Sequence, residues 1–153
     1  MGIFGRRNRP KQDNLQAVSA IVERILHSAG INVAQSRMSD VDYGWRFRQG
    51  SATIEIYVTE KEGRYYFQVL APIMHVPQSG LLPLYRRLLE MNLVATNLTF
   101  GVHTDVVYIF HERPIDGMDD QEAHDIISEI SQNADRYDNE LVHEFGGRLY
   151  QSV

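Results

Sequence analysis

The sequence predicts an α+β fold in which a helix, three antiparallel strands, a second helix, a two-stranded hairpin and a long helix follow one another. Three features support this prediction. Apolar residues recur at steps of three and four in three separate segments, which is typical of amphipathic helices. Between these segments apolar and polar residues alternate with a period of two, which is typical of half-buried strands. Short polar turns separate the strand runs, so the sheet is expected to be mainly antiparallel.

The first helix is predicted from an apolar stripe made of Leu15, Val18, Val22, Ile25 and Ala29. Asp13 and Gln16 are placed as its capping pair, and Gly30 supplies its end. The residues before it mix Gly, Arg, Asn and Pro without periodicity. We therefore expect a flexible basic tail over residues 1–12, a single α+β domain over 13–147 and a C-terminal tail over 148–153.

The three strands are predicted to share one register over residues 43–71. A two-residue turn at 50–51 places Phe47 opposite Ile54, Trp45 opposite Ile56 and Tyr43 opposite Val58, with Arg46 opposite Glu55 on the other face. A second turn at 62–63 places Val58 opposite Phe67, Ile56 opposite Val69 and Ile54 opposite Ala71. One face of the sheet is then apolar, and the other is mixed.

The second helix is predicted to be capped by Ser79 and to tolerate Pro83 in its first turn. Its apolar residues cover well over half of its circumference: Leu81, Leu84, Tyr85, Leu88, Leu89 and Met91. One side must pack on the sheet. The remaining apolar width is more than the sheet requires, so it is expected to face a second subunit.

A hairpin and a long acidic helix complete the predicted fold. The hairpin turns at 104–105 and pairs Leu98, Phe100 and Val102 with His111, Ile109 and Val107. Asp119 and Glu122 open the helix, and Gly146 and Gly147 end it. Its apolar stripe is Ala123, Ile127, Ile130, Ala134, Tyr137, Leu141 and Phe145.

Charge and composition restrict the function. The chain has 153 residues, a net charge of −5 and no cysteine, so thiol chemistry and cysteine-ligated metal sites are excluded. Four bases lie in the first eleven residues, and the rest of the chain carries −9. An acidic body repels nucleic acid. Charge at Arg6 and Arg7 precedes any apolar run long enough for a signal peptide, and no later stretch could span a bilayer, so we expect a cytoplasmic protein without a membrane partner.

The run Leu88-Leu89-Glu90-Met91-Asn92, followed by the strand Leu98-Thr99-Phe100-Gly101, resembles the YbjN family, described as bacterial sensory transduction regulators. The order of elements over roughly residues 13–147 also resembles the type III secretion chaperone fold. The resemblance implies a small acidic protein, often dimeric, that presents apolar surface to an extended client segment and performs no chemistry. It also implies dimerisation through the second helix, with Leu81, Leu84, Tyr85, Leu88 and Met91 at the interface.

Apolar and aromatic side chains on the mixed face are the candidates for client contact: Tyr57, Tyr66, Leu70, Tyr108 and Phe110. Aromatic enrichment marks interfaces but also ordinary cores. Cover by a flanking helix or by a dimer mate therefore remains an equal alternative for these positions.

No catalytic or metal site is predicted. His143-Glu144 is followed by Gly147 where a zinc-binding helix would need its second histidine. His103 and His111 fall opposite Val106 and Leu98, so they cannot share an ion. Ser79 lacks the glycine-flanked elbow of serine hydrolases. No glycine-rich loop joins a strand to a helix, so no dinucleotide cofactor is expected.

The leading interpretation is a non-enzymatic, chaperone-like or regulatory protein-binding module, working as a homodimer on a protein client. The alternative is a stress-linked nucleic-acid accessory protein that uses Arg6, Arg7, Arg9 and Lys11 to neutralise phosphates. Four charges are few against the acidic body, so nucleic acid is the less favoured partner.

Overall fold

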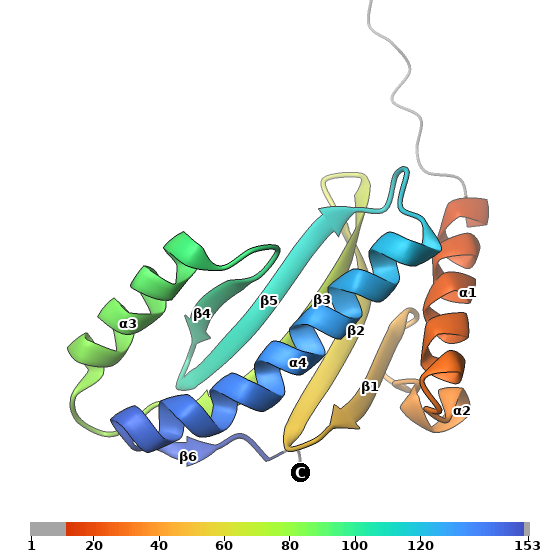
Figure 1. The fold of residues 1–153 in the computed structure, drawn as a ribbon. Coiled ribbons are helices and arrows are strands. Elements are labelled where there is room, and N and C mark those ends of the chain that lie inside the picture. The colour runs from red at the N-terminus through yellow and green to blue at the C-terminus, as the bar shows by residue number, and fades with distance from the viewer. Residues whose placement is uncertain (1–11, 152–153) are drawn as a thin grey trace, which may run out of the picture.

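The computed structural model describes residues 12–151 and contains one six-stranded antiparallel sheet (Figure 1). Its elements are α1 (Gln12–Ser28), α2 (Val33–Ser36), β1 (Gly44–Gln49), β2 (Ala52–Lys61), β3 (Arg64–His75), α3 (Leu81–Val94), β4 (Thr99–His103), β5 (Val106–Pro114), α4 (Asp120–Phe145) and β6 (Arg148–Leu149). The strand order is β1-β2-β3-β5-β4, and β6 pairs with β3. The predicted α+β class and order of the longer elements are confirmed.

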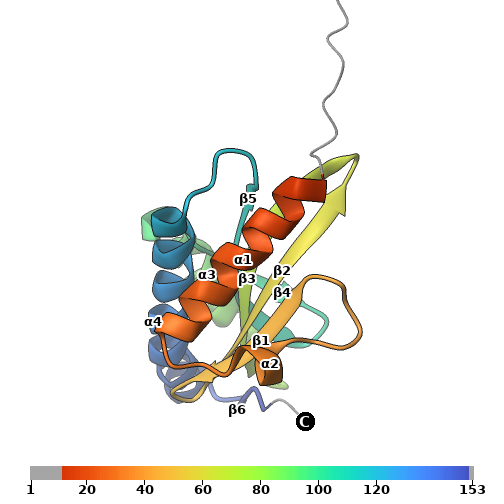
Figure 2. The same ribbon diagram turned by 90° about the vertical axis from the view of Figure 1, so that its right-hand side faces the viewer.

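Helices α1 and α4 lie on one face of the sheet, which we call the inner face (Figure 2). The opposite, outer face carries no helix among residues 12–151. Helix α3 lies beside the edge strand β4 (Figure 1). Within these residues, helices cover one face of the sheet and leave the other open.

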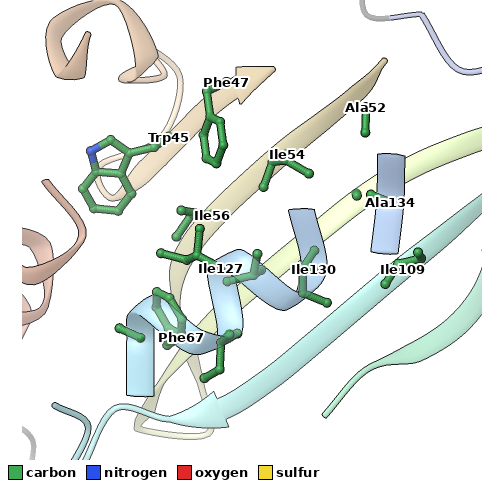
Figure 3. Packing of buried hydrophobic residues seen from close by; sticks show 14 of the residues in the cluster. Trp45, Phe47, Ala52, Ile54, Ile56, Phe67, Ile109, Ile127, Ile130 and Ala134 are labelled. Atoms are coloured by element: carbon green, nitrogen blue, oxygen red, sulfur yellow. The ribbon is translucent and has the colours of Figure 1, made fainter. Parts of the chain in front are cut away.

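The predicted strand register is confirmed. Trp45 pairs with Ile56 and Phe47 with Ile54, while Val58 pairs with Phe67. In the hairpin formed by β4 and β5, Phe100 pairs with Ile109 and Val102 with Val107. The period of two places the large apolar side chains on the inner face, where they pack against Ile127, Ile130 and Ala134 of α4 (Figure 3). Trp45, Ile54, Ile56, Phe67 and Ile109 are fully buried there.

The observed helix ends agree with the predicted ends in three places and differ from them in two. Asp119 caps α4, with its side chain accepting a hydrogen bond of 2.8 Å from the Glu122 N–H. Gly146 follows α4, and Gly30 ends α1 with a positive φ and the backbone bonds of a Schellman motif. Helix α1 begins at Gln12, so Asp13 lies inside it rather than before it. The prediction that Ser79 caps α3 is wrong, because the cap is Gly80 with φ 73° and no side-chain bond.

The turn between β1 and β2 is fastened to α4. Asp135 accepts a hydrogen bond of 2.8 Å from the Ser51 N–H, and Asp138 accepts one of 2.6 Å from the Ser51 hydroxyl. Gly50 has φ 58°, and a Cβ atom added there would lie 1.9 Å from the Asp135 carboxylate. Only glycine fits this turn while the helix holds it.

The central strand β3 changes partner along its length. Its ladder with β2 ends at the pair Glu55 and Leu70, and Pro72, which has no N–H, follows at a register shift. Beyond the shift Met74 pairs with Leu149 of β6. The predicted C-terminal tail thus contributes a strand, which was missed because two residues are too short to show alternation.

Candidate functional site

A groove of about 440 Å³ lies on the outer face, beside β4. We call it the outer groove. Strands β2, β3 and β5 form its floor and β4 its far wall. It is lined by Glu55, Tyr57, Leu70, Thr99, Phe100, Gly101, Val102, His103, Tyr108 and Phe110.

Four of the five residues predicted for client contact line the outer groove: Tyr57, Leu70, Tyr108 and Phe110. They come from three strands and meet because Leu70 pairs directly with Phe110. All four are partly exposed. Tyr66 is not part of the outer groove; it pairs with Thr59 and Pro114, and the Lys61 ammonium lies 5.7 Å from its ring centre.

A polar network forms the β2 side of the outer groove. The Arg46 Nε donates to Glu55 Oε1 over 2.8 Å, and the Tyr57 hydroxyl donates to Glu55 Oε2 over 3.0 Å. Burial, together with the nearby Glu55 carboxylate, raises the pKa of Tyr57 to about 12. Tyr57 is therefore a neutral hydrogen-bond donor at physiological pH, and the Glu55 charge is held by two fixed partners. The pairing of Arg46 with Glu55 was predicted, but the place of Glu55 in a groove was not.

The far wall of the outer groove is an exposed strand edge. In an antiparallel ladder every second residue turns its N–H and C=O away from its partner strand. In β4 these residues are Phe100 and Val102. The Asn92 side chain of α3 occupies both groups of Phe100, accepting from its N–H over 2.7 Å and donating to its C=O over 3.0 Å. The backbone of Val102 is left at the edge, and its side chain is 39% exposed.

Helix α3 divides into a buried and an exposed apolar side. Of the residues predicted for a dimer interface, Leu84, Leu88 and Met91 lie in the core of the single chain, and Leu81 and Tyr85 are partly buried. The exposed apolar side chains of the helix are Leu82 (79%), Leu89 (68%), Leu93 (87%) and Val94 (81%). Apart from the half-buried Leu81 and Tyr85, the residues predicted for a dimer interface thus lie on the buried side of the helix.

No group of three histidine, aspartate or glutamate side chains in residues 12–151 could hold a metal ion. His103 pairs with Val106 as predicted, and it lies at the rim of the outer groove. Ser79 is exposed in the turn before α3. Arg6, Arg7, Arg9 and Lys11 lie outside the described residues. Across the part of the chain that the structure describes, no helix has the length and apolarity needed to cross a membrane.

A sheet sealed on one face by helices and grooved on the other defines a small α+β binding scaffold, and comparisons with known proteins agree. The chain belongs to the family described as T3SS (YopN, CesT) and YbjN peptide-binding chaperone 1, which matches residues 16–153. The resemblance found in the sequence is thereby confirmed. A search of curated proteins found no match.

Solved structures share the fold, among them the following two. A chain in the crystal structure of the ExsC-ExsE complex is 12% identical, with a TM-score of 0.60, and the similarity covers 82% of this chain and 94% of that one. A chain in the structure of the HopA1-SchA chaperone-effector complex is 8% identical, with a TM-score of 0.57, and the similarity covers 83% of this chain and 96% of that one.

Proposed function

We propose that this protein is a chaperone-like module that holds an extended apolar segment of a client protein in the outer groove. The observation that carries the proposal is the convergence of Tyr57, Leu70, Tyr108 and Phe110 on an uncovered sheet face. Aromatic side chains in an open groove supply large contact area at low entropic cost. Membership of a peptide-binding chaperone family supports the same role.

The exposed edge of β4 suits an extended client. A strand laid beside β4 could exchange backbone hydrogen bonds with Val102, while alternate side chains enter the groove. The Asn92 bonds to Phe100 limit this pairing to the end of β4 near the 104–105 turn. The groove contributes a single carboxylate, Glu55, which already has two partners, so apolar contact rather than charge selects the segment.

A photo-crosslinking experiment tests the groove. A photoreactive phenylalanine analogue at Phe110 should crosslink to a client peptide, which mass spectrometry identifies after nuclease treatment. The same analogue at Tyr66, which lies on the same face but outside the groove, is the matched control. Replacement of Tyr108 and Phe110 by serine should abolish capture while the far-ultraviolet circular dichroism spectrum is unchanged. Equal crosslinking from both positions, or full capture by the folded double variant, would contradict the proposal.

We further propose that two copies associate through the exposed side of α3. The exposed side of this helix carries Leu82, Arg86, Leu89, Glu90, Leu93 and Val94. A two-fold axis at the level of Leu88 would set Leu82 opposite Val94 of the partner subunit and Arg86 opposite Glu90 of the partner subunit. At these two pairs the exposed side of the helix is therefore complementary to itself in an antiparallel dimer. Arg86 and Glu90 already form an ion pair of 2.8 Å within one helix, so they can exchange partners.

Light scattering of the double variant Leu89→Glu with Leu93→Glu tests this pairing. The variant should be monomeric and as stable as a native monomer, because both side chains are exposed in the single chain. The charge-reversing pair Arg86→Glu with Glu90→Arg preserves the complementarity and should remain dimeric. A double variant that dimerises with unchanged affinity would move the interface away from this helix.

We propose, finally, that the protein acts without catalysis and that nucleic acid is not its principal partner. The family to which it belongs is one of peptide-binding chaperones. The acidic charge of the chain beyond its first eleven residues disfavours phosphate backbones.

A further inference from the structure

A second groove, of about 750 Å³, lies at the opposite side of the sheet from β4. We call it the acidic groove. It opens beside the start of β1, where Gly44 pairs with Tyr57 and β2 continues beyond this pair. Its lining comes from the start of α1, the loop before β1, the end of β2 and the start of β3: Leu15, Asp40, Val41, Asp42, Tyr43, Tyr57, Val58, Thr59, Glu60 and Tyr65.

Within residues 12–151, no strand pairs with the edge of β2 in the acidic groove. The last bond from this edge runs from the Val58 N–H to the Tyr43 C=O, over 3.0 Å. Because every second residue of a strand faces the same edge, the backbone groups of Glu60 turn towards the groove. An extended segment could therefore lie along β2 at the place where β1 is missing.

The charge of the acidic groove has one sign. Asp40, Asp42 and Glu60 are exposed in its lining, and none of the three forms a salt bridge with another residue of 12–151. Among the residues that the structure describes, the lining contains no lysine or arginine. Nearby Lys61 is engaged on the outer face by Glu112. Carboxylates beside tyrosine rings form a surface that suits lysine and arginine side chains.

A basic segment of the same chain precedes the acidic groove in the sequence. Arg6, Arg7, Arg9 and Lys11 precede Leu15, and Leu15 is part of the groove lining. Eleven residues span up to roughly 35 Å when extended, so they reach the whole groove from the start of α1. A tethered segment also has a high effective concentration at its site. Four positive charges beside the positive end of α1 would be unfavourable unless acids compensate them.

We infer that the N-terminal arm, residues 1–11, docks in the acidic groove of its own chain through its four basic side chains. The acidic groove lies at the β1 side of the sheet and shares one lining residue, Tyr57, with the outer groove. The inferred docking does not depend on the function proposed for the outer groove. It also accounts for the separation of a basic arm from an acidic body, because the two attract each other.

Paramagnetic relaxation tests the inference on the full chain. The native sequence has no cysteine, so Asn8→Cys gives one site for a nitroxide label. We expect strong broadening of the backbone amide signals of Asp40–Asp42 and Glu60 at low salt. At 1 M salt, where the Debye length is about 3 Å, the broadening should be lost.

Neutralising the acids of the groove or the bases of the arm should also reduce the broadening. Asp40→Asn with Asp42→Asn and Glu60→Gln should lower the ratio of docked to free arm by roughly tenfold, the size that several exposed ion pairs give together. Replacement of the four arm bases by serine tests the other side without touching the folded body. The control Asp125→Asn with Glu129→Gln and Glu144→Gln makes the same charge change on α4 and should leave the broadening unchanged.

Three results would overturn the inference. They are absence of broadening at the groove in the native chain, broadening that survives neutralisation of the groove or of the arm, and an equal loss in the α4 control. The last would show that net charge, rather than this groove, holds the arm.

Discussion

The two faces of the sheet are built from alternate residues of the same strands, but they differ in what covers them. On the inner face, Phe67 is fully buried beneath α4, whereas its neighbour Tyr66 is only partly covered on the outer face. The inner face is closed by side chains of the chain's own helices, and the outer face keeps aromatic side chains within reach of another molecule. The same pattern of alternation therefore supplies the core with one half of its residues and the groove with the other.

The largest expected effect separates the two faces directly. Phe67→Ala should lower the free energy of unfolding by about 3–5 kcal/mol, because it removes a buried ring and leaves a cavity. Tyr66→Ala, one residue away, should cost less than about 1 kcal/mol. Urea unfolding of both variants measures the contrast. Equal losses would mean that the outer face is as tightly packed as the inner face.

The turn between β1 and β2 tests how firmly α4 holds the sheet. Gly50→Ala should destabilise the protein by about 2 kcal/mol, because alanine is strained at φ 58° and its Cβ would displace the Asp135 carboxylate. Gly63→Ala is the matched control, since Gly63 also has a positive φ but no atom within 4 Å of an added Cβ. A difference of less than a few tenths of a kcal/mol between the two thermal denaturation curves would exclude the clash.

The polar network of the outer groove predicts a pH dependence. The pKa of Tyr57 is raised from 10.0 to about 12 by burial and by Glu55. The neutral Tyr57 hydroxyl stabilises the folded state. This stabilisation is complete below about pH 10 and is lost as the pH rises through about 12, because tyrosine in the unfolded chain ionises first. Between these pH values the free energy of unfolding of the native protein should fall by roughly 1–2 kcal/mol more than that of the Tyr57→Phe variant. Parallel stability curves for the two proteins would show that Tyr57 titrates normally.

The smallest effect concerns the edge of β4. Asn92→Ala removes two hydrogen bonds from Phe100 and should cost about 1 kcal/mol, since water replaces them in part. It should also free the backbone of Phe100 and so lengthen the edge open to a client. Amide hydrogen exchange at Phe100 should become faster in the variant. Unchanged protection of that amide would mean that Asn92 does not cover the edge.

Local patterns made the sheet predictable. A period of two and two-residue turns determine both the pairing of strands and the face of each side chain, so Trp45 and Ile56 could be paired from sequence alone. The grouping of Tyr57, Leu70, Tyr108 and Phe110 followed from the same alternation. Tyr66 shares their face but lies further along the strands, and alternation carries no information on that position.

Helix α3 shows why the rest could not be predicted. Leu84, Leu88 and Met91 form one helical stripe, and Leu82, Leu89 and Leu93 form another. Both are apolar, so hydrophobicity could not decide which side meets the sheet. The bonds from Asn92 to Phe100 depend on the approach of α3 to β4, which no local pattern encodes. They give a physical role to the asparagine that carried part of the family resemblance.

Pro72 also has a consequence for folding. Its ring offers no donor at the point where β3 leaves β2, so a neighbouring strand that slipped by one residue would find a carbonyl without a partner. Slippage by one residue would also turn every buried side chain of that strand to water. Pro72 therefore disfavours misaligned pairing of the strands beside β3, at the centre of the sheet.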